Sequence, residues 1–142
     1  MAELTNPSVN TSTSRQTFHR AERLRSRKLI EQVAKEGKNV SGGYFRLKWL
    51  KATLDGNYPA QLAISVSKKR FKRSVDRNRI KRLIREVYRK KKYEIYETLQ
   101  QQEMQVALLL MYSSDILPTY VEVENDLTII LKKLQSAVIR TA

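Results

Sequence analysis

The sequence contains no cysteine and only one histidine, His19, among its 142 residues. Without cysteine, disulfide bonds, thiolate metal sites and thiol catalysis are excluded. A single histidine also argues against a histidine-based metal cluster and against a Ser-His-Asp triad. The composition therefore speaks against most of the hydrolytic chemistry that proteins carry out at neutral pH.

Long hydrophobic runs are absent as well. The longest apolar run spans residues 106–112 and has the length of a strand, whereas a membrane-spanning helix needs about 20 apolar residues. The N-terminus has no charged segment followed by an apolar one, as a secretory signal peptide would have. We therefore expect a cytoplasmic protein with no membrane partner.

Acidic residues are scarce in one segment, residues 68–92. This segment holds 14 of the 28 Lys and Arg residues but only two acids, Asp76 and Glu86, in a chain of net charge +14. Charge concentrated in this way indicates a surface that meets a polyanion. Nucleic acid is the first interpretation and an anionic membrane surface is the second.

The domain organisation is simple. Residues 1–16 are polar and rich in Ser, Thr and Asn, with too little apolar content to bury, which predicts a flexible tail. The remaining chain, residues 17–142, is long enough for one domain with a real core. No internal repeat divides it.

Hydrophobic periodicity and turn signals predict the order helix, strand, strand, helix, strand, helix. The expected ranges are 26–38, 44–54, 60–67, 75 or 76 to 99, 105–112 and 120–139. Ser26 is the expected N-cap of the first helix, and Gly37 is expected to end it in a left-handed conformation. The short link between the first two strands predicts a hairpin. We expect a two-layer α+β domain in which the helices lie against one small sheet.

The basic helix divides into two faces when it is projected at 100° per residue. Its apolar face comprises Ile80, Leu83, Ile84 and Val87, and its basic face comprises Asn78, Lys81, Arg82, Arg85, Arg89 and Lys92. A helix face that is only solvated normally mixes charges of both signs, because opposite charges four residues apart stabilise it. Arginine in addition grips phosphate oxygens in pairs and stacks on bases, so a nucleic-acid contact is the preferred interpretation.

One other function remains as an alternative at this point, and three more are disfavoured. A structural RNA-binding protein of the ribosomal type would use the same helix without a cleft for a single strand. A helix-turn-helix DNA-binding module needs a tight turn and a second helix, which are missing before Ser74. A membrane-surface helix would need the apolar face that the core requires. A protein-only nuclease would need clustered carboxylates, whereas the acids here are scattered.

Two motifs in close succession carry a family resemblance. The run SVSKK at residues 65–69 is followed by SVDRNRIKRLIREVYR at residues 74–89. Together they resemble the bacterial ribonuclease P protein component, in which an Arg-Asn-Arg sequence opens a basic helix just after a strand that ends in Ser-x-x-Lys-Lys. Phe18, Arg23 and Leu24 resemble the N-terminal region of that family.

The resemblance implies a role that composition could not show. The family's protein assists a catalytic RNA that removes the 5′ leader from precursor tRNA, and the RNA holds the catalytic Mg²⁺. The protein itself is then expected to bind no cofactor or metal and to supply no catalytic residue. The resemblance further implies one protein per RNA, a cleft between the first helix and the sheet for the leader, and a left-handed βαβ crossover, against the usual right-handed preference.

Site residues are carried over by position. The expected RNA contacts are Lys68, Lys69, Arg73, Arg77, Asn78, Arg79, Lys81, Arg82, Arg85 and Arg89. The leader-cleft candidates are Phe18, Ile30, Ala34, Tyr44, Arg46 and Lys48. Ile30 and Ala34 stand where family members often place two aromatic residues that stack on leader bases. Since stacking contributes about 1–3 kcal/mol per base, leader contact in this chain is expected to be weaker or to be moved to other residues.

Overall fold

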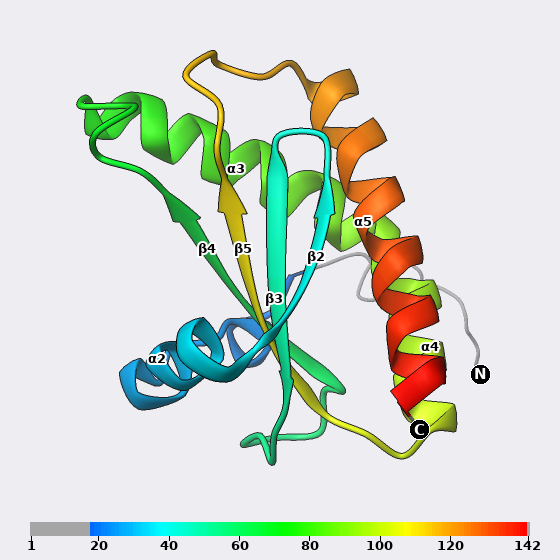
Figure 1. Cartoon of the computed structure of the whole chain (residues 1–142). Coiled ribbons are helices and arrows are strands. Elements are labelled where there is room, and N and C mark those ends of the chain that lie inside the picture. The colour runs from blue at the N-terminus through cyan, green and yellow to red at the C-terminus, as the bar shows by residue number, and fades with distance from the viewer. Residues whose placement is uncertain (1–17, 142) are drawn as a thin grey trace, which may run out of the picture.

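The computed structural model describes residues 18–141, so the tail expected over residues 1–16 lies outside the described residues (Figure 1). The elements are η1 (Arg20–Glu22), α2 (Arg27–Glu36), β2 (Lys38–Gly42), β3 (Phe45–Lys51), β4 (Ala60–Val66), α3 (Ser74–Lys91), α4 (Tyr93–Gln101), β5 (Val106–Tyr112) and α5 (Tyr120–Thr141). The α+β class is as predicted. Strand β2 was not predicted, and the helix expected over residues 75–99 is divided into α3 and α4.

The strands form one mixed sheet in the order β2-β3-β5-β4. Strand β5 pairs antiparallel with β3 and parallel with β4. The hairpin predicted between β3 and β4 is therefore wrong, because β5 lies between them. The reason is the apolar character of β5, which has six of its seven residues buried. Such a strand is stable at the centre of a sheet, where both of its faces are covered.

The hairpin of this sheet is instead formed by β2 and β3, which pair antiparallel from Lys38↔Trp49 to Gly42↔Phe45. Its turn contains Gly43, whose φ of 57° is a conformation that glycine adopts without strain. A Cβ atom at this position would lie 2.2 Å from the Asp126 carboxylate. Gly42, the last residue of β2, and Gly43 therefore form the tight turn that leads into β3.

Helix α2 begins as predicted, with the Ser26 hydroxyl accepting a hydrogen bond of 3.3 Å from the Leu29 N–H. It also ends at Gly37, but the expected left-handed conformation is wrong. Gly37 has φ −66° and ψ 150°, because the chain continues directly into the extended strand β2. Glycine is required here by close approach, since a Cβ atom would lie 2.4 Å from the Val33 carbonyl oxygen.

The sheet and the helices α3, α4 and α5 form the two main layers, and α2 lies on the other face of the sheet (Figure 1). The larger core fills the space between the sheet and these three helices. Six residues of α5, spaced at the helical repeat, are buried in it: Val123, Leu127, Ile130, Leu131, Leu134 and Val138. On α3, Ile80, Ile84 and Val87 are buried as predicted and Leu83 is half-buried. Complete burial of such a side chain stabilises the fold by about 1.5–3 kcal/mol.

The division between α3 and α4 falls at Lys92, whose side chain is buried instead of lying on the basic face. Its ammonium group forms an ion pair with the Glu22 carboxylate, which is fully buried. The same carboxylate accepts hydrogen bonds of 2.7 Å from the Tyr96 hydroxyl and from the His19 N–H. Burial raises the pKa of Tyr96. The prediction of one continuous helix is wrong, because α3 ends at Lys91 and α4 begins at Tyr93. Beyond this junction α4 packs beside α5 (Figure 1).

Helices α3 and α4 connect the two parallel strands β4 and β5, which are neighbours in the sheet. This connection is the βαβ unit that the family resemblance implies, and its left-handedness stays a prediction. No helix within residues 18–141 combines the length and the apolar character needed to cross a membrane.

Candidate nucleic-acid interface

All ten predicted RNA contacts lie on α3 or in the turn that leads into it. The side chains of Lys68, Lys69, Arg73, Asn78, Arg79 and Arg82 are exposed, and those of Arg77, Lys81, Arg85 and Arg89 are half-buried. Because the opposite face of α3 is packed on the core, the helix presents a fixed basic surface. The sequence pattern predicted this division into two faces.

Arg77 is committed to the backbone of its own turn. Its guanidinium donates hydrogen bonds of 2.7 Å to the Phe71 carbonyl and 2.9 Å to the Lys72 carbonyl. These bonds fasten the segment between β4 and α3 to the first turn of the helix. The sequence motif marks Arg77 as an RNA contact, and the structure adds a second role, in positioning the helix.

Acidic partners neutralise the two ends of α3. The Arg89 guanidinium donates to both carboxylate oxygens of Glu86, at 3.0 and 2.5 Å, and these bonds lower the pKa of Glu86. At the other end Arg73 lies 3.8 Å from Asp76. No acidic residue of the described chain forms an ion pair with the basic residues between them. Those residues are Arg77, Arg79, Lys81, Arg82 and Arg85. Most of the α3 residues without an acidic partner therefore lie in the middle of the helix, and Lys91 at its end has no ion pair within the described residues either.

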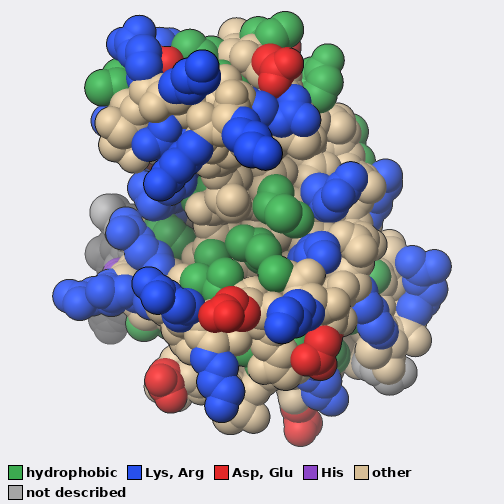
Figure 2. Space-filling model, turned by 60° about the vertical axis from the view of Figure 1, so that its left-hand side comes forward, with side chains coloured by type: hydrophobic (Ala, Val, Ile, Leu, Met, Phe, Trp, Pro, Cys, Tyr) green, Lys and Arg blue, Asp and Glu red, His purple; other side chains and the backbone are tan. Residues whose placement is uncertain are grey.

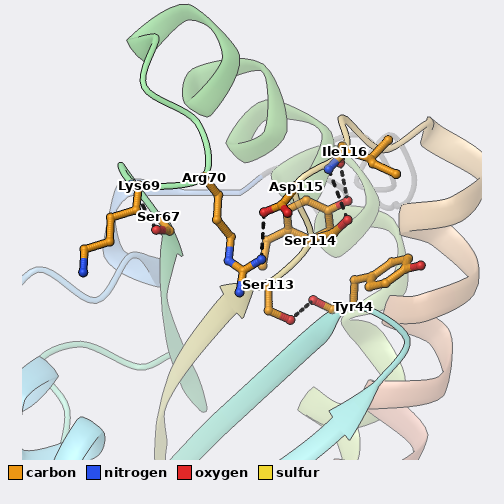
Figure 3. A network of polar contacts seen from close by, with 9 residues as sticks. Tyr44, Ser67, Lys69, Arg70, Ser113, Ser114, Asp115 and Ile116 are labelled. Atoms are coloured by element: carbon orange, nitrogen blue, oxygen red, sulfur yellow. Dashed lines mark hydrogen bonds and ion pairs between the residues drawn. The ribbon is translucent and has the colours of Figure 1, made fainter.

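In the turn after β4, one basic side chain is paired with an acid, and two others have no ion pair within the described residues (Figure 3). Arg70 forms an ion pair of 2.8 Å with Asp115, which connects this turn to the loop after β5. The Ser67 hydroxyl accepts a hydrogen bond of 3.2 Å from the Lys69 N–H and fixes the backbone of the turn. The Lys69 side chain points away from the Arg70–Asp115 pair (Figure 3). Arg70 thus stabilises the turn, while the two predicted lysines remain exposed.

Four of the six leader-cleft candidates lie on α2 or on the face of the sheet that α2 partly covers. Ile30 and Ala34 come from α2, and Arg46 and Lys48 come from β3. The Lys48 ammonium donates a hydrogen bond of 2.6 Å to the Ala34 carbonyl, and Arg46 stands opposite Met111 of β5. Because α2 covers only part of this face, apolar and basic side chains share the remaining surface.

The apolar part of this surface belongs to a second, smaller core. Its half-buried members include Ile30, Leu50, Ala63 and Met111. Figure 2 shows hydrophobic side chains in a hollow, with Lys and Arg side chains above it and both basic and acidic side chains below it. A hollow with an apolar floor and basic side chains at its rim can receive bases and phosphates at the same time. We call this surface the α2 cleft.

Phe18 and Tyr44 lie away from the α2 cleft. The Phe18 ring packs edge-on against Tyr88 of α3, with 5.6 Å between the ring centres. Tyr44 is 57% exposed in the turn between β2 and β3, where its N–H donates to Asp126 of α5. Trp49, another aromatic residue close to these candidates in the sequence, is 2% exposed and belongs to the larger core. The structure thus gives the α2 cleft an aliphatic floor.

Arg85 lies beside a basic group that the sequence pattern did not include. Burial lowers the pKa of Arg85, and repulsion from Arg23 makes a smaller contribution in the same direction. Arg23 belongs to the segment that precedes α2, far from Arg85 in sequence. The periodicity of basic residues along α3 could not have revealed this neighbour.

Within residues 18–141, no group of three or more His, Asp or Glu side chains is arranged to hold a metal ion.

Comparisons with known proteins show what the chain as a whole is similar to. The family model Ribonuclease P matches residues 18–135. The chain is 35% identical to the ribonuclease P protein component of Porphyromonas gingivalis over 132 residues, which cover 92% of this chain and 91% of the relative. It is 38% identical to the corresponding protein of Thermotoga maritima over 77 residues, which cover 54% of this chain and 62% of that protein.

Solved structures share the fold. The RNase P protein of Staphylococcus aureus superposes with a TM-score of 0.60 at 23% identity, covering 81% of this chain and 96% of that one. The RNase P protein of Thermotoga maritima superposes with a TM-score of 0.57 at 24% identity, covering 79% and 96%. In both comparisons the fold corresponds over most of the chain.

Proposed function

Since this chain belongs to the ribonuclease P protein family, and is thereby a protein component of a ribonucleoprotein that processes tRNA, we propose that it has two RNA-binding surfaces. The basic face of α3 binds the catalytic RNA. The α2 cleft binds the 5′ leader of precursor tRNA. The protein raises the affinity for the precursor, and the RNA carries out the cleavage.

The observation that carries this proposal is the uncompensated charge on one fixed helix face. Arg79, Arg82 and Arg85 lie on a helix that is anchored by a buried apolar face, and none of them has an acidic partner within residues 18–141. Like charges held together in this way repel each other. Phosphates of an RNA backbone would relieve that repulsion and would accept the paired hydrogen bonds that guanidinium groups donate.

The α2 cleft supports the second part of the proposal. Arg46 provides exposed positive charge beside Met111, its cross-strand neighbour, which together with Ile30 packs against the second core. An extended single strand could place its phosphates at the basic side and its bases on the apolar floor. Ile30 and Ala34 are aliphatic, so bases in the α2 cleft would pack against aliphatic side chains and would not stack on aromatic rings at these positions.

Several acids of the protein are engaged in structural contacts. Glu22 holds Lys92, Glu86 holds Arg89, and Asp115 holds Arg70. These carboxylates stabilise the surfaces that are proposed to bind RNA. We accordingly assign the Mg²⁺ requirement of the reaction to the RNA, and we propose a cytoplasmic particle with one protein monomer per RNA.

Reconstitution tests the proposal directly. The full-length protein, the cognate catalytic RNA and a precursor tRNA are mixed at a Mg²⁺ concentration at which the RNA alone is slow. We expect cleavage at the 5′ end of the mature tRNA with protein and RNA together, and no cleavage with protein alone. The control is the same protein with a precursor whose leader has been replaced by a single nucleotide, for which the stimulation should be smaller.

Each failure has a distinct meaning. Cleavage by the protein alone would assign the chemistry to the protein and overturn this division of labour. RNA binding without any effect on processing would favour a structural RNA-binding protein of the ribosomal type. Equal stimulation of long-leader and short-leader precursors would remove the leader from the proposal and leave the RNA contact in place.

A further inference from the structure

Three arginines outside α3 form a basic group at the outer edge of β4. Arg20, Arg23 and Arg25 line a shallow depression of about 430 Å³. None of them belongs to the basic segment of residues 68–92, and all three side chains are exposed. We call them the edge arginines.

The backbone that carries the edge arginines is fixed to the sheet. Arg23 forms a parallel β-bridge with Leu62 of β4, and the Leu24 N–H donates a hydrogen bond of 2.9 Å to the Leu62 carbonyl. The Leu24 side chain is buried in the second core. Because side chains alternate along an extended segment, Arg23 and Arg25 both point away from that core. The group is therefore held in place before any ligand arrives.

The acid nearest in sequence does not neutralise this group. Glu22 lies between Arg20 and Arg23 in the sequence, but it is fully buried and forms its ion pair with Lys92. No edge arginine has an ion pair within the described residues. The Arg23 guanidinium instead lies over the Phe18 ring, with 5.4 Å between its central carbon and the ring centre. That contact orients the guanidinium without cancelling its charge.

The edge arginines continue the basic surface of α3. The Phe18 ring lies under the Arg23 guanidinium and packs against Tyr88, which follows Arg85 by three residues on α3, so the edge arginines approach α3 near Arg85. Burial of Arg85 lowers its pKa, and repulsion from Arg23 lowers it further. Neither guanidinium forms an ion pair with an acid of residues 18–141. An anion between these two groups would be held by both, with the paired hydrogen-bond geometry that guanidinium offers to phosphate.

We propose that Arg20, Arg23 and Arg25 form, together with Arg85, a binding site for backbone phosphates of an RNA strand that passes from α3 over the edge of β4. This inference rests on the proposed function, because it assumes that α3 lies on RNA. It extends that contact beyond the basic helix to a surface formed by the segment before α2.

The test compares two double variants of the full-length protein. Arg20→Gln with Arg25→Gln removes two exposed edge arginines, and Arg140→Gln with Lys132→Gln removes the same charge from exposed positions on α5. Affinity for the catalytic RNA is measured at several salt concentrations. We expect the edge variant to bind more weakly, with a log–log salt slope smaller by roughly 0.7–0.9 for each phosphate that is no longer bound. The α5 variant should keep the slope of the unaltered protein.

Two further arms identify the source of the phosphate and separate this inference from its premise. Arg82→Ala is measured in parallel: if it weakens RNA binding while the edge variant behaves like the α5 variant, the edge site is refuted and the proposed function stands. If Arg82→Ala also leaves the affinity for the catalytic RNA unchanged, the proposed contact of α3 with RNA is refuted and the edge site loses its premise. Inorganic phosphate is titrated as a probe. Loss of phosphate-ion binding in the edge variant without loss of RNA affinity would make the group a site for a small anion and overturn the assignment to RNA.

Discussion

At the scale of single residues, the basic side chains of residues 68–92 perform different tasks. Arg70 and Arg89 are paired with Asp115 and Glu86, and Arg77 is bonded to backbone carbonyls. The charges of Arg70 and Arg89 contribute little to the attraction of a polyanion, because a neighbouring acid offsets each of them. Arg82 and Arg85 have no such partner among the described residues, and they carry the prediction at this scale.

Changing Arg82 and Arg85 together to Ala should weaken binding of the catalytic RNA and flatten its salt dependence. The slope of log affinity against log salt should fall by roughly 0.7–0.9 for each phosphate that the variant no longer neutralises. Neither side chain forms an ion pair within residues 18–141, so the urea-unfolding midpoint should change little. An unchanged slope, measured by filter binding over several salt concentrations, would mean that these side chains do not touch phosphate.

A matched control for this pair is Arg89→Ala. Arg89 stands on the same helix, but Glu86 already offsets its charge through two hydrogen bonds. If simple proximity to RNA decided the effect, this change would cost as much per residue as those at Arg82 and Arg85. We expect a smaller effect on the slope, because the charge that Arg89 contributes to the surface is already offset and lies at the end of the helix.

At the scale of elements, the junction of α3 and α4 depends on one buried ion pair. Lys92 is 2% exposed and Glu22 is fully buried, and the pair connects η1 to the junction across 70 residues of sequence. Removing one partner of a buried pair leaves an uncompensated charge in the core, which costs about 3–5 kcal/mol. The pair therefore fastens η1, which precedes the segment of Arg23 and Arg25, to the junction of α3 and α4.

Lys92→Met should accordingly lower the free energy of unfolding by about 3–5 kcal/mol, measured by urea denaturation. The neighbouring Lys91→Met changes an exposed residue and should cost less than about 0.5 kcal/mol. The double change Glu22→Gln with Lys92→Met should recover part of the loss, because it removes the buried charge. Equal stability of the two single variants would show that the pair does not hold the junction.

The sequence was sufficient for features that depend on local periodicity. The buried faces of α3 and α5 follow from the helical repeat, and the N-cap at Ser26 follows from the chemistry of its side chain. The pairing of strands depends on contacts far apart in the sequence, so proximity along the chain suggested a β3–β4 hairpin that β5 in fact prevents. Projection of one regular helix past its end likewise placed Lys92 on the basic face, although the ion pair with Glu22 buries it.

The candidate site likewise contains residues that the sequence reveals and contacts that only the fold reveals. The run from Arg77 to Arg89 was visible in the sequence because one helix carries all of it. The approach of Arg23 to Arg85 was not, since it depends on how the segment before α2 lies along β4. Similarly, the sequence grouped Phe18 and Tyr44 with the leader-cleft candidates, and the structure places them on other parts of the surface.

At the scale of the whole molecule, the two proposed RNA surfaces lie on opposite faces of one sheet. Helix α3 covers the face that carries the larger core, and the α2 cleft opens on the other face beside Arg46. A rigid sheet between two surfaces allows the protein to hold the catalytic RNA on one side and a leader strand on the other. The two surfaces should then contribute to separate measurements, because they share no side chain.

This separation predicts the behaviour of Arg46→Ala and Arg82→Ala, alone and combined. Arg46→Ala should reduce the preference of the assembled enzyme for precursor over mature tRNA and leave the affinity for the catalytic RNA unchanged, whereas Arg82→Ala should mainly lower that RNA affinity. Distant sites without shared partners combine additively to within about 0.3–0.5 kcal/mol, so the double variant should show the sum of both effects in precursor-binding titrations. A coupling clearly larger than this would mean that one continuous RNA strand contacts both residues, and the two-surface arrangement would have to be abandoned.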